Sequence, residues 1–476
     1  MARSKTVTSV RGALRDLALA IGRRSPIVLS AVRARSVASQ ARSYRALWDS
    51  IAVEPSVVVF ESFEGRGFTD SPRALYQAML RDPRFADTEK VWAFRAPLLR
   101  ALQARGGYDI RGIGAPAPGD VVSVDLDATL GARALEELRA AVIVPFKSPE
   151  YRRTHARASV WISNTVVPSY MALRPGQTYL QAWHGTPFKR LGCDIPSGTA
   201  GSAGMSVRDI HERYRHEGAR LTWLLSQSPY ATDKLGSAFD LVSTGRTGAI
   251  VEAGYPRNDF LATFTEEDVV RIRTRLGVPE GKKVILYAPT WRENQHTSGV
   301  GYTFETEADF GALREALGDE YVVLFRAHCL VASTFDFAAH GGFVIDVSST
   351  DDISDLYVIS DVLVTDYSSV FFDYGNLRRP VVFYMYDLDQ YAGEVRGLYL
   401  SLDELPGPVV RTTGELVDAL RASEQPTAQD VAGRERFRGA FSPLDDGHAS
   451  ERVIQRMLAG GAKLAGTDRA GGGSAS

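Results

Sequence analysis

The chain has 476 residues, enough for two ordinary domains that each bury a core of their own. An apolar fraction of 44% with 10% aromatic residues excludes a disordered chain, and a net charge of −2 argues against nucleic acid as a partner. Its two cysteines, Cys193 and Cys329, favour a reducing cytosol over a disulfide framework. No apolar run reaches the 18 or so residues of a membrane span, and no secretory signal peptide is apparent.

Residues 1–50 form a basic arm with ten Lys or Arg residues against two Asp residues, a net charge of +8. Four apolar residues of this arm share one face at helical spacing: Val10, Leu14, Leu17 and Ile21. A basic amphipathic helix of this kind is typical of segments that lie on an anionic membrane. A solvated N-terminal arm fits the same residues, and both interpretations stay open. Residues 459–476 are predicted to form a flexible tail.

Apolar strands then alternate with helices along the chain. In the first half, short apolar runs predict strands near residues 56–60, 90–94, 140–146, 158–163 and 178–183, with a helix over 72–80 after the first strand. The second half repeats the pattern, with strands near 282–291, 320–328, 341–348, 361–369 and 379–386 and helices over 352–360 and 370–377. This alternation predicts two doubly wound α/β units with mostly parallel sheets, over residues 55–250 and 251–458.

A histidine turn, Gly185–Thr186–Pro187 behind His184, follows the apolar run 178–183. The turn ends the strand and directs the imidazole out of its carboxyl end, where ligands bind in such folds. An imidazole there is suited to accept a proton from a hydroxyl near neutral pH. Thr186 in the turn and Lys189 close behind it are candidate substrate-binding residues, the lysine to attract an anion. A buried histidine hydrogen-bonded within a turn explains the same residues equally well.

Two further clusters follow strands of the second half. Arg326 and His328 end one strand and together predict a cationic pocket suited to phosphate oxygens. Another strand runs into Thr365, Asp366, Ser368 and Ser369 and then into a helix, whose first free N–H groups favour a phosphate. Plain capping of that helix by Asp or Ser is the competing interpretation. The sequence contains no P-loop, no glycine-rich dinucleotide fingerprint after a strand, and no metal-ligand motif, so no metal is assigned.

Several ordered motifs resemble the CDP-glycerol glycerophosphotransferases, the teichoic-acid primases and polymerases of Gram-positive bacteria. The likeness covers about residues 55–455 and rests on the segments VVVFESFEGRGFTDSPRALY (57–76), WHGTPFKRLG (183–192), GYPRND (254–259), YAPTWR (287–292), FRAH (325–328), DDISDLY (351–357) and DVLVTDYSSVFFDYGNLRRPVVFY (361–384). It implies a GT-B-like fold, two Rossmann-like domains that face a central cleft. The first would be the acceptor-side domain and the second the CDP-polyol-binding domain.

The resemblance also implies an activity. It implies transfer of glycerol phosphate from CDP-glycerol to a hydroxyl of a lipid-linked acceptor, with release of CMP. It further implies peripheral attachment to the cytoplasmic face of the cell membrane and no required cofactor. His184 matches the base histidine of the family and His328 its second essential histidine, and Arg292 matches the arginine of its PTWR motif. Thr365, Ser368 and Ser369 match the diphosphate-binding turn, and Asp352 matches a glycerol contact. Cys329 departs from the usual proline after the second histidine, which puts the local turn geometry in question.

Two other functions stay open at this point. One is a GT-B glycosyltransferase that uses a nucleotide sugar, and the other is a non-catalytic nucleotide-binding scaffold at the membrane. The sequence also leaves open whether the polyol is glycerol or ribitol, and whether one unit or many are added.

Overall fold

A computed structural model describes residues 26–114, 123–199, 205–290, 296–297, 301–303, 308–326, 331–332, 336–389 and 397–462 of the chain. The predicted amphipathic helix around Val10–Ile21, the residues Arg292, His328 and Cys329, and most of the tail lie outside these ranges. None of the described helices is both long enough and apolar enough to span a bilayer.

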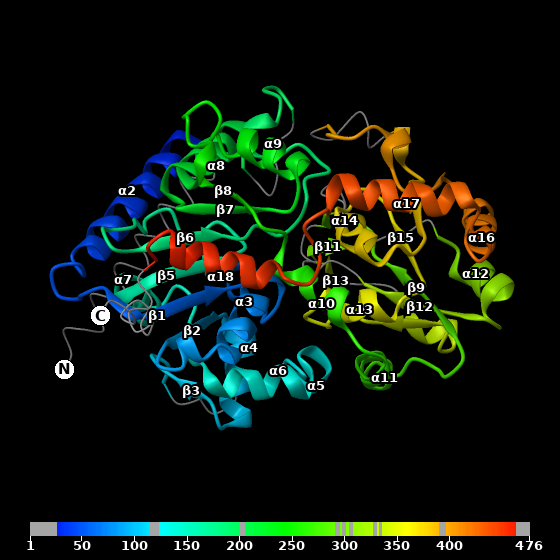
Figure 1. Cartoon of the computed structure of the whole chain (residues 1–476), viewed down its shortest axis with the longest axis horizontal. Helices are drawn as coiled ribbons and strands as arrows, with labels where there is room; N and C mark the ends of the chain where they lie inside the picture. Colours follow the sequence, from blue (N-terminus) through cyan, green and yellow to red (C-terminus); the bar gives the residue numbers. More distant parts are fainter. Residues whose placement is uncertain are drawn as a thin grey trace, which may run out of the picture.

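Two parallel sheets lie side by side and form the centres of two lobes (Figure 1). The first lobe contains a sheet of strand order β3-β4-β2-β1-β5-β6-β7-β8. Its strands are β1 (Glu54–Glu61), β2 (Glu89–Phe94), β3 (Asp109–Ile110), β4 (Val142–Pro145), β5 (Ala158–Ser163), β6 (Thr178–Gln181), β7 (Trp223–Ser226) and β8 (Ile250–Glu252). Continuous apolar runs such as Val57–Phe60 form these strands because helices cover both faces of the sheet.

The second lobe repeats this plan with strand order β14-β12-β9-β15-β16-β17. Its strands are β9 (Lys283–Tyr287), β12 (Tyr321–Phe325), β14 (Val344–Asp346), β15 (Val362–Thr365), β16 (Val381–Tyr384) and β17 (Val409–Val410). A small separate sheet contains β10 (His296–Thr297), β11 (Gly301–Thr303) and β13 (Val331–Ala332). The two parallel sheets confirm the predicted α/β class.

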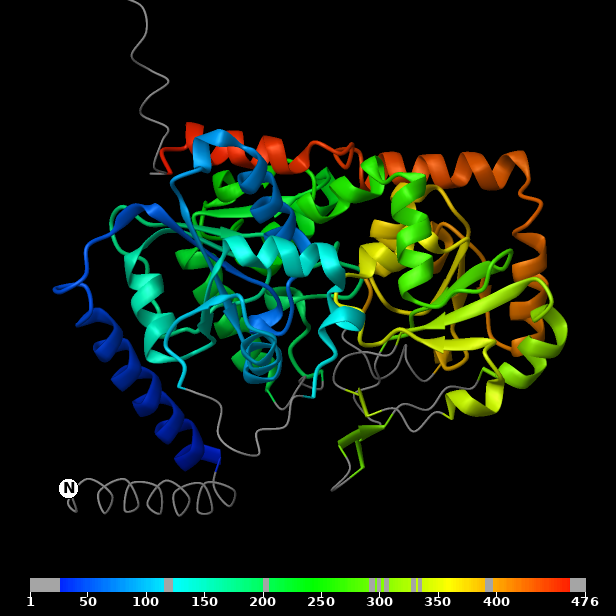
Figure 2. The same ribbon diagram turned by 90° about the horizontal axis from the view of Figure 1, so that it is seen from below.

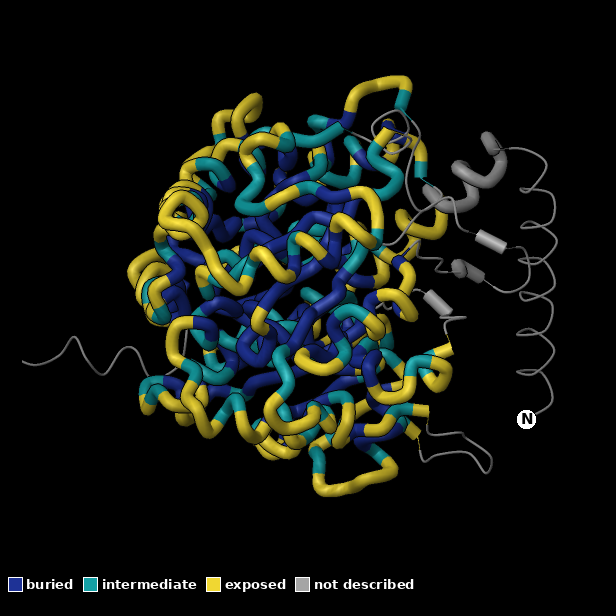
Figure 3. The backbone as a smooth tube through the Cα atoms, turned by 90° about the vertical axis from the view of Figure 1, so that its right-hand side faces the viewer, coloured by how far each residue is buried: buried dark blue, intermediate teal, exposed yellow. Residues whose placement is uncertain are grey.

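The helices cover these sheets (Figure 2). The buried residues therefore lie at the centre of each lobe (Figure 3). Those of the first lobe are α2 (Pro26–Arg45), α3 (Asp70–Arg81), α4 (Ala96–Arg105), α5 (Leu126–Thr129), α6 (Gly131–Glu137), α7 (Pro149–Arg157), α8 (Val207–Arg220) and α9 (Pro229–Ala238). The remaining ones are α10 (Asp259–Thr263), α11 (Glu266–Arg275), α12 (Phe310–Leu317), α13 (Ile353–Ile359), α14 (Val370–Tyr374), α16 (Thr413–Ala422), α17 (Ala428–Phe441) and α18 (Ala449–Ala459).

Two segments depart from the predicted division at residues 50 and 250. Helix α18 belongs in sequence to the second unit, but Val453, Ile454 and Met457 pack in the core of the first lobe, and α18 lies over that lobe in Figure 1. Within the predicted basic arm, Tyr44 is fully buried in the first lobe with Trp48 beside it. Each segment packs on the lobe where its apolar side chains are buried, because this burial is favourable wherever the segment stands in the sequence.

Each sheet has a point where the chain, after adding strands on one side of its first strand, goes on to add them on the other side. In the first sheet this switch lies between β1 and β5, and in the second it lies between β9 and β15. Loops that leave neighbouring strands at such a point run in opposite directions, so the crevice between them is the usual ligand site of a doubly wound fold. The candidate site is therefore expected where the carboxyl ends of these four strands face one another.

Candidate active site

His184 lies beside the switch point of the first sheet. The strand β6 ends at Gln181, and Trp183 has a left-handed backbone with φ 52°, which turns the chain and leaves the His184 side chain exposed. The imidazole Nδ1 lies 2.7 Å from the carbonyl oxygen of Asn164, the residue that follows β5. A carbonyl can only accept, so Nδ1 carries the proton and the neutral ring has its lone pair on Nε2.

Asn164 also fixes the loop after β1. Its Oδ1 accepts a hydrogen bond of 2.8 Å from the backbone N–H of Phe63, and the Phe63 ring lies 5.8 Å from the ring of His184, centroid to centroid. Asn164 thus ties the β1 loop and the imidazole together at the switch point. Sequence reasoning missed Asn164, although a polar residue directly after the apolar strand 158–163 was a usable signal.

The remainder of the histidine turn is held between the lobes. Phe188 packs in the core of the second lobe, with its ring 5.1 Å from that of Phe371 and perpendicular to it. The backbone of Lys189 pairs with that of Leu398, and Lys189 itself is half-buried. The Thr186 hydroxyl is buried and accepts a hydrogen bond of 2.5 Å from Gln227. Thr186 and Phe188 therefore anchor the turn, and His184 is left at its exposed tip.

The switch point of the second sheet faces this turn. A Cβ built on Gly185 would lie 2.9 Å from the Ser369 hydroxyl, so the turn and the start of α14 are in direct contact across the lobes. Ser368 and Ser369 are half-buried, and Ser369 occupies the N-cap position of α14 without a capping hydrogen bond from its side chain. This contact brings together two motifs that are 180 or so residues apart in the chain.

Thr365 and Asp366 stabilise the turn after β15 from within. The Thr365 hydroxyl donates to the Ala288 carbonyl at 2.8 Å, and Asp366 Oδ1 accepts from the backbone N–H of Thr290 at 2.7 Å and of Tyr367 at 2.6 Å. Both side chains are at least 98% buried. They join the ends of β9 and β15, so their hydrogen bonds shape the turn that presents the two serines.

Arg326 and Asp352 follow the neighbouring strands of the second sheet. Arg326 comes directly after β12, is half-buried, and donates to the Thr350 carbonyl at 2.6 Å. Asp352 caps α13 through the Ser354 N–H and pairs with Arg73 of α3 at 3.2 Å. The predicted partners of this cluster, Arg292 and His328, lie outside the described residues.

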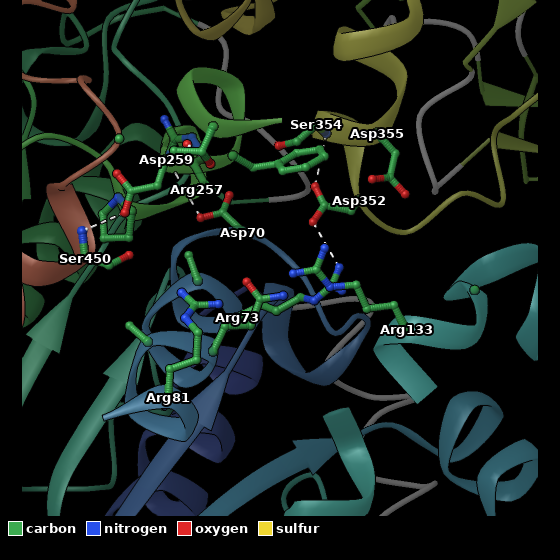
Figure 4. A pocket seen from close by; sticks show the side chains of 18 of the residues that line it. Asp70, Arg73, Arg81, Arg133, Arg257, Asp259, Asp352, Ser354, Asp355 and Ser450 are labelled. Carbon is green, nitrogen blue, oxygen red and sulfur yellow. Dashed lines mark hydrogen bonds and ion pairs between the residues drawn. The ribbon is translucent and has the colours of Figure 1, made fainter. Parts of the chain in front are cut away.

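Asp352 faces a cavity between the lobes that is separate from the histidine turn, shown in Figure 4. This cavity has a volume of about 720 Å³, and among the predicted site residues Asp352 alone lines the part that the structure describes. Many of its charges are paired, for example Arg73 with Glu137 at 3.1 Å and Arg275 with Asp355 at 2.6 Å. Arg73 and Asp352 point toward one another in Figure 4. Because carboxylates already neutralise these guanidinium groups, the cavity is a less suitable place for phosphate chemistry than the histidine turn.

The lobes also approach each other where Asp351 meets the loop after β1. Asp351 Oδ2 accepts from the Phe68 N–H at 2.6 Å, and a Cβ on Gly67 would overlap Asp351 Oδ1. We expect Gly67→Ala to push Asp351 away and lower the free energy of unfolding by roughly 1–3 kcal/mol. Urea titration measures this change, with Gly414→Ala as the control, because Gly414 is a helical residue with open space around its Cβ. Equal stability of both variants would contradict the close approach at Gly67.

Glu61 is a buried carboxyl at the end of β1, beneath the site. Burial raises its pKa to about 7, although Tyr151 donates a hydrogen bond of 2.7 Å to it. The folded state therefore binds this proton more tightly than the unfolded state, and the stability that it contributes is lost as the pH rises through about 7. We expect Glu61→Gln to stabilise the protein by about 2 kcal/mol at pH 8 and to have no such effect at pH 4. Urea titrations at both pH values measure this, and an equal effect at both would contradict it.

Residues 43–459 match the family model described as CDP-Glycerol:Poly(glycerophosphate) glycerophosphotransferase. The chain belongs to this family. Membership confirms the family predicted from the motifs and makes the protein a transferase.

Individual relatives agree with this assignment. A teichoic acid glycerol-phosphate transferase of Staphylococcus aureus is 37% identical over 406 residues, which cover 85% of this chain and 93% of that protein. A teichoic acid poly(glycerol phosphate) polymerase of Bacillus subtilis is 33% identical over 88% of this chain, but the match spans about half (51%) of its own length. A solved structure of the wall teichoic acid polymerase TagF superposes with a TM-score of 0.73 at 32% identity and covers 95% of this chain and 98% of that one. The superposition confirms the predicted two-lobed fold.

Proposed function

We propose that the protein transfers glycerol phosphate from CDP-glycerol to a hydroxyl of a membrane-linked acceptor and releases CMP, as a step in teichoic-acid synthesis. The observation that carries this proposal is the contact between the His184 turn and Ser369, because it joins the switch points of the two sheets into one site. Family membership supplies the reaction class, and the relatives named for glycerol phosphate support glycerol as the polyol.

In the proposed step, Nε2 of His184 accepts the proton of the acceptor hydroxyl as its oxygen attacks the β-phosphorus of CDP-glycerol. The new bond joins the acceptor oxygen to that phosphorus. The bond between the phosphorus and the bridging oxygen breaks, and its electron pair leaves with CMP. The Nδ1–H bond to Asn164 keeps the lone pair on Nε2 throughout the approach. General-base assistance of this kind contributes a factor of roughly 10²–10⁴ in rate.

Charge develops on the diphosphate as CMP leaves, and cationic groups of the second lobe are proposed to stabilise it. Arg326 stands at the end of β12, and the resemblance adds Arg292 and His328. Ser368 and Ser369 are proposed to donate hydrogen bonds to the diphosphate oxygens from the turn after β15. Preorganised donors at the charge that develops are worth several kcal/mol in catalysis.

No metal or cofactor is assigned to this reaction, so we expect CMP release to persist in EDTA.

The acceptor is proposed to be presented at the cytoplasmic face of the membrane, where the basic arm over residues 1–50 binds anionic lipid. Removal of residues 1–25 tests this part, because Tyr44 and Trp48 stay in place to fill the first-lobe core. If the arm is a membrane contact, the shortened protein binds anionic vesicles more weakly than the full chain does. Added salt then weakens vesicle binding of the full chain only. Equal binding by both proteins would refute that role for the arm.

The activity itself is tested by a panel of donors. The purified full chain is incubated with CDP-glycerol, CDP-ribitol and UDP-sugars in the presence of a polyol phosphate acceptor, and release of CMP or UDP is measured. CMP release that requires CDP-glycerol and acceptor supports the proposal. Release of UDP alone would establish a glycosyltransferase, and binding of nucleotide without any release would establish a scaffold.

A further inference from the structure

Four cationic side chains gather around the loop after β1, the loop whose Phe63 packs against His184. They come from four different parts of the first lobe: Arg66 from the loop itself, Arg95 after β2, Lys147 after β4 and Arg213 from α8. The loop is held in place because Glu64 donates its backbone N–H to Thr165 at 3.2 Å and Phe63 donates to Asn164. We refer to Arg66, Arg95, Lys147 and Arg213 as the cationic cluster.

Glu64 is the centre of this cluster. Its carboxylate lies 2.5 Å from Arg95 Nη2, 3.3 Å from Arg66 Nη2 and 3.9 Å from Arg213 Nη2. Lys147 joins them through the Phe146 ring, whose centroid lies 4.9 Å from Lys147 Nζ and 5.3 Å from the Arg95 guanidinium carbon. The Glu64 carboxylate thus gathers three guanidinium groups, and Lys147 lies on the ring beside one of them. Together with Glu64, the four cations of the cluster have a net charge of +3.

The excess charge is accessible to a ligand. The side chains of Arg66, Arg95 and Arg213 are 37%, 35% and 39% exposed, so their remaining N–H groups can reach a molecule in solution. The carboxyl group behind them, Glu61, is buried, and its raised pKa of about 7 favours the neutral form up to that pH. Guanidinium groups suit phosphate oxygens, because their N–H donors are fixed in a planar fork.

The loop after β1 connects the cationic cluster with His184, and this indicates which phosphate the cluster can bind. Glu64 follows Phe63, whose ring lies 5.8 Å from the imidazole ring. In a polymer of glycerol phosphate, the terminal hydroxyl is separated from the first phosphodiester by a single three-carbon unit. A hydroxyl at His184 therefore places that phosphodiester within reach of the loop after β1.

We propose that the cationic cluster binds the phosphodiester next to the attacking hydroxyl of the acceptor. This inference rests on the proposed function. It adds to that function the group of the acceptor that the protein recognises. The cluster selects acceptors that already carry a phosphate close to their free hydroxyl. It also holds that hydroxyl at the imidazole of His184, on the side opposite the donor-binding second lobe.

The test compares two soluble acceptors, a short-chain alkyl glycerol phosphodiester and the matching uncharged alkyl glycerol. We expect the wild-type protein to prefer the charged acceptor in kcat/KM, and Arg66→Gln/Arg213→Gln to reduce that preference about tenfold through a higher KM for the charged acceptor. Arg95 is left in place, because its Nε also donates a hydrogen bond of 2.9 Å to the backbone carbonyl of Glu64 and so supports the loop. Arg208→Gln is the matched control, since Arg208 lies on the same helix as Arg213, is 87% exposed, and should leave the preference unchanged.

The outcomes separate the two proposals. No CMP release by the wild-type protein with either acceptor refutes the proposed function. Normal CMP release with an unchanged preference in a double variant that melts at the wild-type temperature refutes the acceptor site. If that variant instead loses binding to vesicles of phosphatidylglycerol while its kinetics with soluble acceptors stay normal, the cluster contacts lipid headgroups and the acceptor site is likewise refuted.

Discussion

Replacement of His184 with alanine is expected to lower the rate of glycerol phosphate transfer by a factor of roughly 10² or more. The variant loses the group proposed to take the acceptor proton, while the donor contacts proposed for the second lobe remain. The Gly185–Ser369 contact and the Phe188 anchor are independent of the imidazole, so the fold of the turn should persist. CMP release measures the rate, and equilibrium binding of CDP-glycerol to the same variant should give a Kd within a few-fold of wild type.

The control for this variant is His448→Ala. His448 precedes α18 and its side chain is 68% exposed, so its loss should leave transfer unchanged. Turnover by His184→Ala at the wild-type rate would exclude the proposed base. A comparable loss in CDP-glycerol affinity would instead show that the imidazole binds the donor.

Removal of the Asp373 carboxylate is expected to destabilise the folded protein strongly. Asp373 of α14 accepts hydrogen bonds of 3.0 Å from both Nε and Nη2 of Arg257, and one of 2.9 Å from Asn258. Arg257 is only 7% exposed, so Asp373→Ala leaves a buried guanidinium without its main counterion. The expected loss is about 3–5 kcal/mol in the free energy of unfolding, measured by urea titration.

Asp389→Ala is the control for this prediction. Asp389 pairs with Arg411 at 3.0 Å, but its side chain is 83% exposed, so its loss should cost about 1 kcal/mol or less. A double variant, Arg257→Met/Asp373→Leu, should recover part of the stability because it removes both members of the pair. The recovery should be incomplete, because Asp70 then loses its own contact of 3.7 Å with Arg257. A loss below about 1 kcal/mol for Asp373→Ala would contradict the view that this buried pair stabilises the fold.

Much of the fold follows from local pattern. The runs at residues 57–60, 160–162 and 362–364 are apolar on both faces, and a strand in a covered parallel sheet needs that pattern. His184 and Ser369 were predicted as site residues because each follows such a strand, and ligands of doubly wound folds bind at strand carboxyl ends. Local pattern determines these features because their physical cause acts over a few residues.

Other features depend on how the lobes pack and have no local signal. Thr186 stands in the same turn as His184, yet its hydroxyl is buried against Gln227, and sequence alone assigned it to substrate binding. Helix α18 carries an ordinary amphipathic pattern that does not reveal which lobe will cover it. Glu64 and Arg213 are nearly 150 residues apart, so their approach depends on the whole first lobe. These parts of the site could be found only from the structure.

A structure of the full chain with CDP-glycerol bound tests the central claim most directly. The claim is that the two switch points form one site, with the imidazole of the first lobe facing the diphosphate held by the second. We predict density for the diphosphate beside Ser368, Ser369 and Arg326, with the β-phosphorus on the side that faces Nε2 of His184. Diphosphate density among Arg73, Arg257 and Arg275 in the cavity of Figure 4, away from the histidine turn, would contradict it.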